Sequence, residues 1–320
     1  MINKKIYFII IILLLLTVKV FSQQDKHKGL MSLYIPQEDN LKAIKQYNEA
    51  IKQILKKDSL TNQNIYNLAG CYALLENIDS ALYYLDIYVS STDNFYQKCI
   101  FYDSDFNILK RSEKWEKIQQ KIDNKFLEEY TPKNRELSLK LYYLGLLDQK
   151  ERIGDIRKRE RIVDYSEMSK KDTDIKKEFT KILKQYGFPT YTMVGELSCK
   201  YAQLILQHSS YKLQKKYLQQ IRELANNGET SLTMWALLYD RVQLKEGKPQ
   251  KFGTQSNCNF EKNQNGVFIQ TDCYIEPLEN KELVNEWRKE VGFTTTIEEE
   301  SERLGYPICT DYKKLKKRKY

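Results

Sequence analysis

The sequence has very few histidines and lacks the short motifs that identify many enzyme classes. Its two histidines are His27 and His208, so a domain that contains one of them has no second histidine with which to share a metal ion. It contains no G-x-S-x-G, no glycine-rich phosphate loop and no H-E-x-x-H. None of its six cysteines shows the C-x-x-C spacing of a zinc knuckle or a redox pair. We therefore expect neither a metal nor a cofactor, and the sequence names no reaction.

The longest apolar run lies at the N-terminus and is too short to cross a membrane. Lys4 and Lys5 precede the apolar residues 6–18, and Val20-Phe21-Ser22 follows. A helix of about 13 residues rises about 20 Å, against roughly 30 Å of hydrocarbon. Residues 1–22 are therefore predicted to be a signal peptide cut after Ser22, rather than a membrane anchor. We expect an exported, periplasmic or extracellular protein without a later transmembrane segment, and without a lipid-attached N-terminus because no cysteine follows the run.

Positive charge is concentrated at the two ends of the chain. Loss of Lys4, Lys5 and Lys19 with the signal peptide lowers the formal net charge from +9 to +6. Six further basic residues lie in the last eight positions: Lys313, Lys314, Lys316, Lys317, Arg318 and Lys319. The rest of the chain is close to neutral, so nucleic acid is not an expected partner. Residues 305–320 are predicted to be a basic tail, either simply solvated or in contact with an anionic surface.

The remaining 298 residues are enough for two domains. Residues 23–38 are polar and are expected to form a flexible leader. Residues 39–127 carry a pattern similar to a tetratricopeptide repeat, formed by Ile65, Leu68, Ala69, Tyr72, Ala81 and Leu85. Glu76 replaces the usual turn glycine and the terminal proline is absent, so an ordinary pair of helical hairpins explains the pattern equally well. Both alternatives predict helices, whose surface could receive a protein partner.

A second helical domain is predicted after residues 128–136, where Pro132 interrupts the helical periodicity. Its first helix is charge-rich and extends to about Arg161. The sequence Gly187-Phe188-Pro189 stops a later helix, and three apolar helices follow. The third, around Trp235, is apolar nearly all round and is expected to be buried. The predicted fold class is mainly α, and a helix marked by Leu283, Val284, Trp287 and Val291 is expected to be the last before a loose terminus.

Residues 252–275 carry the one persuasive β signal of the sequence. Asn265-Gly266 is a preferred two-residue hairpin turn, and the residues from Val267 to Ile275 alternate in polarity. A turn there pairs Phe260 with Thr271 and Cys258 with Cys273, so the two sulfur atoms could form a disulfide. The same register makes the cysteines a hydrogen-bonded pair, whose α-carbons stand further apart than in the alternate sites. A disulfide and two free thiols therefore both remain open.

An ordered set of polar residues and turns runs through the second half of the chain. It consists of Asp148-Gln149 with Arg152, Gly187-Phe188-Pro189, Gly195, Gln207-His208, Asp240-Arg241, Gln250-Lys251-Phe252-Gly253-Thr254-Gln255, Trp287-Arg288-Lys289 and Gly292-Phe293. This set resembles an uncharacterised family of bacterial domains over residues 137–304. Phe188 stands where tryptophan is equally expected and Phe252 where tyrosine is usual, and neither change removes a polar group. The resemblance implies a domain boundary and a shortlist of residues, but no activity.

Several shortlisted residues are charged groups within apolar patterns, and buried charges need partners. In a functional interpretation, His208 and Asp240 perform acid–base catalysis, because histidine exchanges protons near neutral pH. An anionic or polar ligand would then be held by Arg152, Arg241, Thr254 and Gln255.

In a structural interpretation, the same groups form a closed network that fixes how the helices and the hairpin meet. Asp148, Gly187, Pro189 and Gly253 would have structural roles in either case. No nucleophile completes the set, so the sequence favours a binding or interaction module, with a hydrolase-like enzyme as the alternative.

Overall fold

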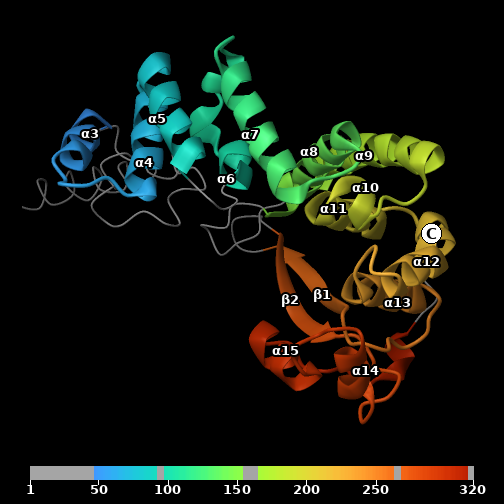
Figure 1. Cartoon of the computed structure of the whole chain (residues 1–320). Coiled ribbons are helices and arrows are strands. Elements are labelled where there is room, and N and C mark those ends of the chain that lie inside the picture. The colour runs from blue at the N-terminus through green and yellow to red at the C-terminus, as the bar shows by residue number, and fades with distance from the viewer. Residues whose placement is uncertain (1–46, 92–96, 154–164, 263–267, 316–320) are drawn as a thin grey trace, which may run out of the picture. The chain divides into compact units, whose positions relative to one another are not determined.

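The computed structural model describes residues 47–91, 97–153, 165–262 and 268–315. These residues are mainly helical and include one antiparallel β-hairpin, as the sequence predicts (Figure 1). They form two compact units, the first ending at Phe126 and the second beginning at Leu127. The predicted signal peptide (1–22) and leader (23–38) lie outside the described residues. Within the described ranges, no helix is both long and apolar enough to cross a membrane.

The first unit is built from short helices packed around an aromatic core. Its elements are α3 (Tyr47–Leu55), α4 (Asn62–Leu74), α5 (Ile78–Ser91), α6 (Gln97–Tyr102), the 3-10 turns η3 (Ser104–Phe106) and η4 (Leu109–Arg111), and most of α7 (Trp115–Tyr130). Helices α4 and α5 form a hairpin and lie side by side in Figure 1. Tyr66, Ala69 and Leu85 are buried between the helices of this unit. The helices expected from the repeat-like pattern are therefore present.

Two local signals set the bounds of the α4–α5 hairpin. Thr61 begins α4 with a capping box, in which its hydroxyl accepts a hydrogen bond from the Asn64 backbone N–H and the Asn64 side chain accepts from the Thr61 N–H. Glu76 has a positive φ of 60° in the turn that follows. This left-handed conformation favours glycine, which is the residue that Glu76 replaces in the repeat-like pattern.

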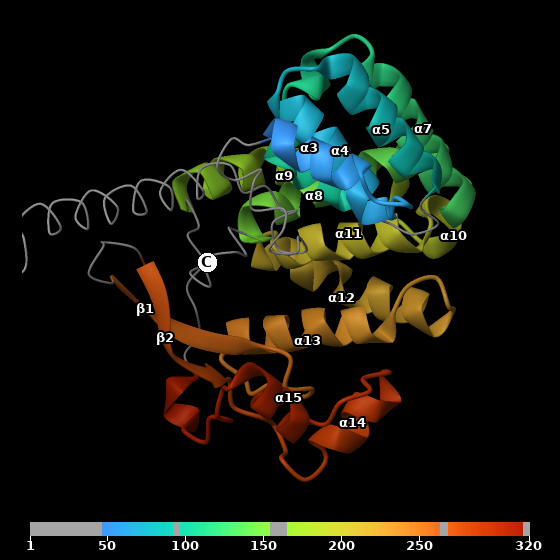
Figure 2. The same cartoon turned by 90° about the vertical axis from the view of Figure 1, so that its left-hand side faces the viewer.

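The second unit contains most of the described helices. They are α8 (Arg135–Ile153), α9 (Tyr165–Tyr186), α10 (Tyr191–Val194), α11 (Glu196–Gln207), α12 (Tyr211–Asn226), α13 (Leu232–Lys245), α14 (Val284–Glu290), α15 (Ile297–Leu304) and the 3-10 turn η6 (Tyr312–Lys314). Helix α8 packs on α11, and α12 packs on α13. Figure 2 shows α13 between α12 and the C-terminal helices α14 and α15. Every residue of α13 is buried or half-buried, as predicted. The part of the predicted charge-rich helix after Ile153 lies outside the described residues.

The prediction that the helix near Trp287 is the last one is wrong, because α15 follows α14. Thr296 and Glu299 form a capping box at its start, and Gly305 ends it at a φ of 69°. These are the standard signals of a helix start and a helix end. They are visible in the sequence as Thr-x-x-Glu and a glycine after the last turn.

The hairpin consists of β1 (Ser256–Lys262) and β2 (Phe268–Ile275). Asn257 pairs with Tyr274 in the predicted register, but Phe260 pairs with Gln270 and not with Thr271. The prediction for the outer half is wrong by one residue, because a bulge between Asn257 and Asn259 shifts the ladder. The predicted turn at Asn265-Gly266 lies outside the described residues.

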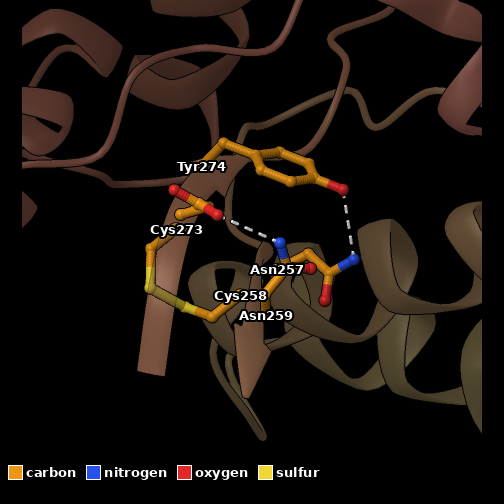
Figure 3. Close-up of a disulfide and its surroundings, with 6 residues drawn as sticks. Asn257, Cys258, Asn259, Cys273 and Tyr274 are labelled. Atoms are coloured by element: carbon orange, nitrogen blue, oxygen red, sulfur yellow. Dashed lines mark hydrogen bonds between the residues drawn. A yellow bond between two sulfur atoms is a disulfide. The ribbon is translucent and has the colours of Figure 1, made fainter. Parts of the chain in front are cut away.

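A disulfide joins Cys258 to Cys273 at this bulge (Figure 3). Their α-carbons are 4.0 Å apart, since the bulge removes the pair from the regular hydrogen-bonded ladder. Hydrogen bonds flank the disulfide on both sides, from the Asn257 amide to the Tyr274 hydroxyl (3.2 Å) and from the Asn259 amide to the Asp272 carboxylate (3.3 Å). At the base of the hairpin, Ile275 pairs in parallel with Ile308 near the end of the chain.

Candidate functional site

Asp240 lies on α13 with no exposed surface, and its carboxylate holds the loop Gln250–Gln255. One oxygen accepts the backbone N–H of Lys251 at 2.8 Å, and both oxygens accept that of Phe252 at 3.1 Å. The second oxygen also accepts the backbone N–H and the hydroxyl of Thr254, at 3.1 and 2.9 Å. Donors from three of the six loop positions, Lys251, Phe252 and Thr254, thus fix the loop on the buried helix.

Burial and hydrogen bonding act in opposite directions on Asp240. Removal from water raises the pKa of its carboxyl, because burial disfavours the charged form. The hydrogen bonds from Phe252, Thr254 and Lys251 lower the pKa, and the net result of both effects is a rise from 3.8 to about 6. Most of these donors are backbone amides, so the loop itself supplies the stabilisation of the charge.

Two further side chains close the same loop. The buried Gln250 accepts the Gln255 N–H through its Oε1 at 2.8 Å and donates to the carbonyls of Glu276 and Gln255. Arg288, on α14, donates to the carbonyl of Phe252 at 2.8 Å. Gly253 has a φ of 68°, and a side-chain carbon there would collide with Ile297. We call this set of Asp240, Gln250, Gly253 and Arg288 around the loop the loop clamp.

His208 belongs to a different cluster. It is the C-cap of α11, and its Nδ1 lies 2.8 and 3.0 Å from the two carboxylate oxygens of Asp148 on α8. The Asp148 side chain is 1% exposed, whereas that of His208 is 19% exposed. Gln149 also donates to the Asp148 carboxylate, at 2.6 Å. The structure therefore pairs His208 with Asp148, while Asp240, the other proposed catalytic residue, is bonded to the loop.

The shortlisted ligand-binding residues divide between these two clusters. Arg241 Nη1 donates to the carbonyl of Gln207, the neighbour of His208, at 3.3 Å. Thr254 and Gln255 belong to the loop clamp region, where Gln255 donates to the Thr254 hydroxyl at 3.0 Å. Arg152 lies in α8, but its side chain is outside the described part of the chain. On the described residues, Arg241 thus bonds beside His208, whereas Thr254 and Gln255 bond in the loop that Asp240 holds.

The remaining shortlisted positions shape the backbone. Gly187 follows the last residue of α9 with a φ of 74°. The carbonyl of Pro189 accepts the Cys199 thiol at 3.3 Å. Burial raises the pKa of that thiol to about 12, so Cys199 is not an activated nucleophile. Its neighbour Ser198 is buried and donates to the carbonyl of Ser138 at 2.7 Å, which also makes it a structural residue.

Gln214, whose amide donates to the carbonyls of Gln207 and Ser209 on either side of His208, was not singled out from the sequence, and Gln250 and Arg288 were named there only within the motif set, without a role. Arg288 has a usable signal, because it stands at helical spacing between Val284 and Val291, which are also buried. Gln250 and Gln214 are fully buried glutamines whose amides bond mainly to backbone groups. Their spacing from apolar residues gives no comparable indication that they are buried. Among the described residues, no group of three or more His, Cys, Asp or Glu side chains could hold a metal ion.

Comparison with known proteins identifies a domain without identifying an activity. Residues 159–304 match the model of a family of unknown function (DUF6624). The match spans α9 to α15 and includes His208, Asp240 and the loop clamp, whereas Asp148 precedes it. It agrees with the expected resemblance to an uncharacterised domain family, although it starts later than residue 137. No curated protein and no solved structure matches the chain.

Proposed function

We propose that the chain is an exported binding module that receives a protein partner on its first unit. The observation that carries this proposal is a group of three tyrosines on the α4–α5 hairpin. Tyr72 of α4 stacks on Tyr84 of α5, with ring centroids 5.5 Å apart and planes 3° apart. Tyr83 meets Tyr84 edge-on at 5.2 Å. We call these three residues the tyrosine surface.

The tyrosine surface has the chemistry of a protein interface. Tyr83 is 62% exposed although its ring is large and mostly apolar. Tyrosine is enriched at protein interfaces, because a rigid ring provides apolar contact and its hydroxyl provides a hydrogen bond. Holding Tyr84 between two other rings reduces the conformational freedom that binding would otherwise remove. These features support a preformed contact surface on the helical hairpin.

The contacts of the loop clamp in the second unit support a structural role for it more than a catalytic one. Asp240 and Gln250 have no exposed surface, and their hydrogen bonds end on loop backbone groups. Such a network fixes a loop in one conformation and leaves no oxygen of Asp240 facing solvent. The disulfide between Cys258 and Cys273 supports export, because disulfides persist outside the reducing cytoplasm.

A site-specific crosslinking experiment tests the partner surface. A photoreactive phenylalanine analogue replaces Tyr83 in the full chain, expressed in a bacterium that carries its gene naturally. Tyr186, 39% exposed on the second unit, receives the same analogue as the matched control. We expect one discrete crosslinked protein from position 83 and none from position 186. Equal adducts at both positions, or none at either, would contradict the proposal.

Export is tested separately by the mass of the mature protein. We expect material recovered from the periplasm or medium to start at Gln23 and to resist alkylation at Cys258 and Cys273 until it is reduced. A chain that keeps Met1 and stays in the cytoplasm would overturn the export part of the proposal. The crosslinking result would still stand on its own.

A further inference from the structure

The Asp148–His208 pair is directed from the interior toward the surface. The carboxylate is buried and can only accept hydrogen bonds when it is ionised, so Nδ1 of His208 carries the hydrogen between them. The neutral imidazole then has its lone pair on Nε2. No group among the described residues bonds to Nε2, and the His208 side chain is partly exposed. The pair therefore presents Nε2 of His208 to solvent as a proton acceptor, and the contact of Asp148 with Nδ1 fixes the tautomer of the ring.

Two buried amide groups lie at the same turn, between α11 and α12. Gln214 Nε2 donates to the carbonyls of Gln207 and Ser209, which flank His208, at 2.7 and 3.0 Å. In the described part of the chain, Gln214 Oε1 and Gln207 Nε2 have no hydrogen-bond partner. Gln214 is 0% and Gln207 6% exposed. A buried amide atom without a partner is costly, and a polar group bound at the turn would satisfy both atoms.

Positive charge is added to the turn by Arg241, whose Nη1 lies 3.3 Å from the Gln207 carbonyl oxygen. Residues of four helices thus contact the turn between α11 and α12: Asp148 of α8 through His208, Gln207 and the C-cap His208 of α11, and Gln214 of α12 and Arg241 of α13 through the backbone carbonyl of Gln207. We call these five residues the turn site. It combines an oriented base, an amide donor, an amide acceptor and a cation.

We propose that the turn site binds a small acyl compound and that His208 acts there as a general base toward water. Acyl hydrolysis requires a hydrogen-bond donor near the base, because negative charge develops on the carbonyl oxygen. Gln207 Nε2 and the Arg241 guanidinium would stabilise that charge. Asp148 is a positioning residue, which holds the imidazole through Nδ1. This catalytic site is independent of the tyrosine surface on the first unit.

The proposed hydrolysis needs only the acyl compound, water and the side chains of the turn site. The oxygen of a water molecule attacks the acyl carbon while Nε2 of His208 accepts one of its protons. The carbonyl electron pair moves onto the oxygen and then returns as the bond to the leaving group breaks. The leaving alkoxide takes the proton back from the imidazolium, and a carboxylic acid and an alcohol are released. The Asp148 carboxylate stabilises the imidazolium between these steps.

Hydrolysis of p-nitrophenyl acetate by the full mature chain tests the proposal. We expect a rate above that of free imidazole at the same concentration. His208→Gln should lower it by about 100-fold or more, and Asp148→Asn by at least about tenfold. His27→Gln removes the chain's other histidine and should leave the rate unchanged. A rate no higher than imidazole, or one insensitive to His208→Gln, would overturn the proposal.

Nitrogen NMR of the His27→Gln chain, whose one imidazole is His208, provides a second readout that does not depend on a folded Asp148 variant. We expect the neutral ring to carry its proton on Nδ1 and to leave Nε2 bare. A neutral ring protonated on Nε2 would exclude His208 as the oriented base. A catalytic rate that survives Asp148→Asn in a folded protein would likewise exclude the positioning role of Asp148.

Discussion

Asp240 and Asp148 are both buried carboxylates of the second unit, yet their partners differ in kind. Asp240 accepts hydrogen bonds from the backbone and hydroxyl groups of a loop, and all of its donors are held in place by that loop. Asp148 accepts a hydrogen bond from His208, whose ring is partly exposed. The first arrangement ends inside the protein, whereas the second reaches the surface. Burial of a charge is therefore not by itself a sign of catalysis; the identity of the donor decides which role the geometry permits.

The largest expected effect comes from Asp240→Ala. The change leaves the buried backbone N–H of Phe252, the part-buried N–H groups of Lys251 and Thr254, and the Thr254 hydroxyl without their acceptor, and each such group costs up to about 1 to 3 kcal/mol when it stays buried. Since the loop can relax, we expect the free energy of unfolding of the second unit to fall by about 3 to 5 kcal/mol. Urea unfolding followed by tryptophan fluorescence measures it, because Trp235 lies in this unit. A loss below about 1 kcal/mol would end the structural assignment of Asp240.

The pH dependence of stability tests the structural role of Asp240 in a second way. The pKa of Asp240 is about 6 in the folded chain and 3.8 when unperturbed, so the folded state holds this proton more tightly. Its contribution to the free energy of unfolding is present below about pH 4 and is lost as pH rises through about 6, by roughly 3 kcal/mol in all. The Asp240→Asn chain should lack this decline. Other carboxyls such as Glu246, with a pKa of about 2, act in the opposite direction, so the difference between the two chains is the quantity to compare. If the free energy of unfolding of the two chains changes with pH in parallel, the raised pKa of Asp240 is contradicted.

A glycine pair separates backbone strain from packing in the loop clamp. Gly253→Ala places a methyl group against Ile297 at a φ of 68°, whereas Gly228 has a φ of 73° and open space around the same position. We expect Gly228→Ala to cost about 1 kcal/mol from the left-handed backbone alone. Gly253→Ala should cost about 2 to 3 kcal/mol, because the collision adds to that strain. Thermal unfolding of both variants measures the difference. Equal losses of stability would mean that the loop moves enough to relieve the collision with Ile297.

The smallest effect is expected from His208→Gln. The histidine is partly exposed, and a glutamine amide at the same position can still donate to Asp148. We expect the free energy of unfolding to change by less than about 1 kcal/mol, as for other pairs near the surface. Chemical unfolding under the conditions used for Asp240→Ala provides the comparison. A loss of several kcal/mol would show that both carboxylates serve the fold alike, and the contrast between them would be gone.

Helix positions were predictable from this sequence to the extent that apolar spacing and caps define them. The buried helix around Trp235 has apolar residues on nearly every side, and α13 is buried or half-buried throughout. Helix α15 has an equally clear local signal in Thr296, Glu299 and Gly305. The hairpin register was predictable only up to the bulge at Cys258, because one inserted residue leaves the alternation of the flanking strands intact.

The partners of the buried charges were less accessible to prediction. Asp240 within an apolar helix had to find donors, but the donors are mostly backbone N–H groups, which every residue other than proline carries. The partner of His208 lies 60 positions earlier in the chain, and nothing in the spacing distinguishes Asp148 from Asp240 as its acceptor. Composition therefore indicated that a polar cluster exists, while the packing of α8 on α11 decides which charges meet.

The parallel bridge between Ile275 and Ile308 affects where the second unit can be cut for study. The family match stops at residue 304, but Ile275 exchanges backbone hydrogen bonds with Pro307 and Cys309, and Tyr312 donates to the Leu278 carbonyl at 2.6 Å. A fragment that ends at residue 304 would expose the backbone of β2 at Ile275, the base of the disulfide-linked hairpin. The open strand edge created there is a common cause of aggregation. Recombinant versions of this domain should retain the chain through Leu315.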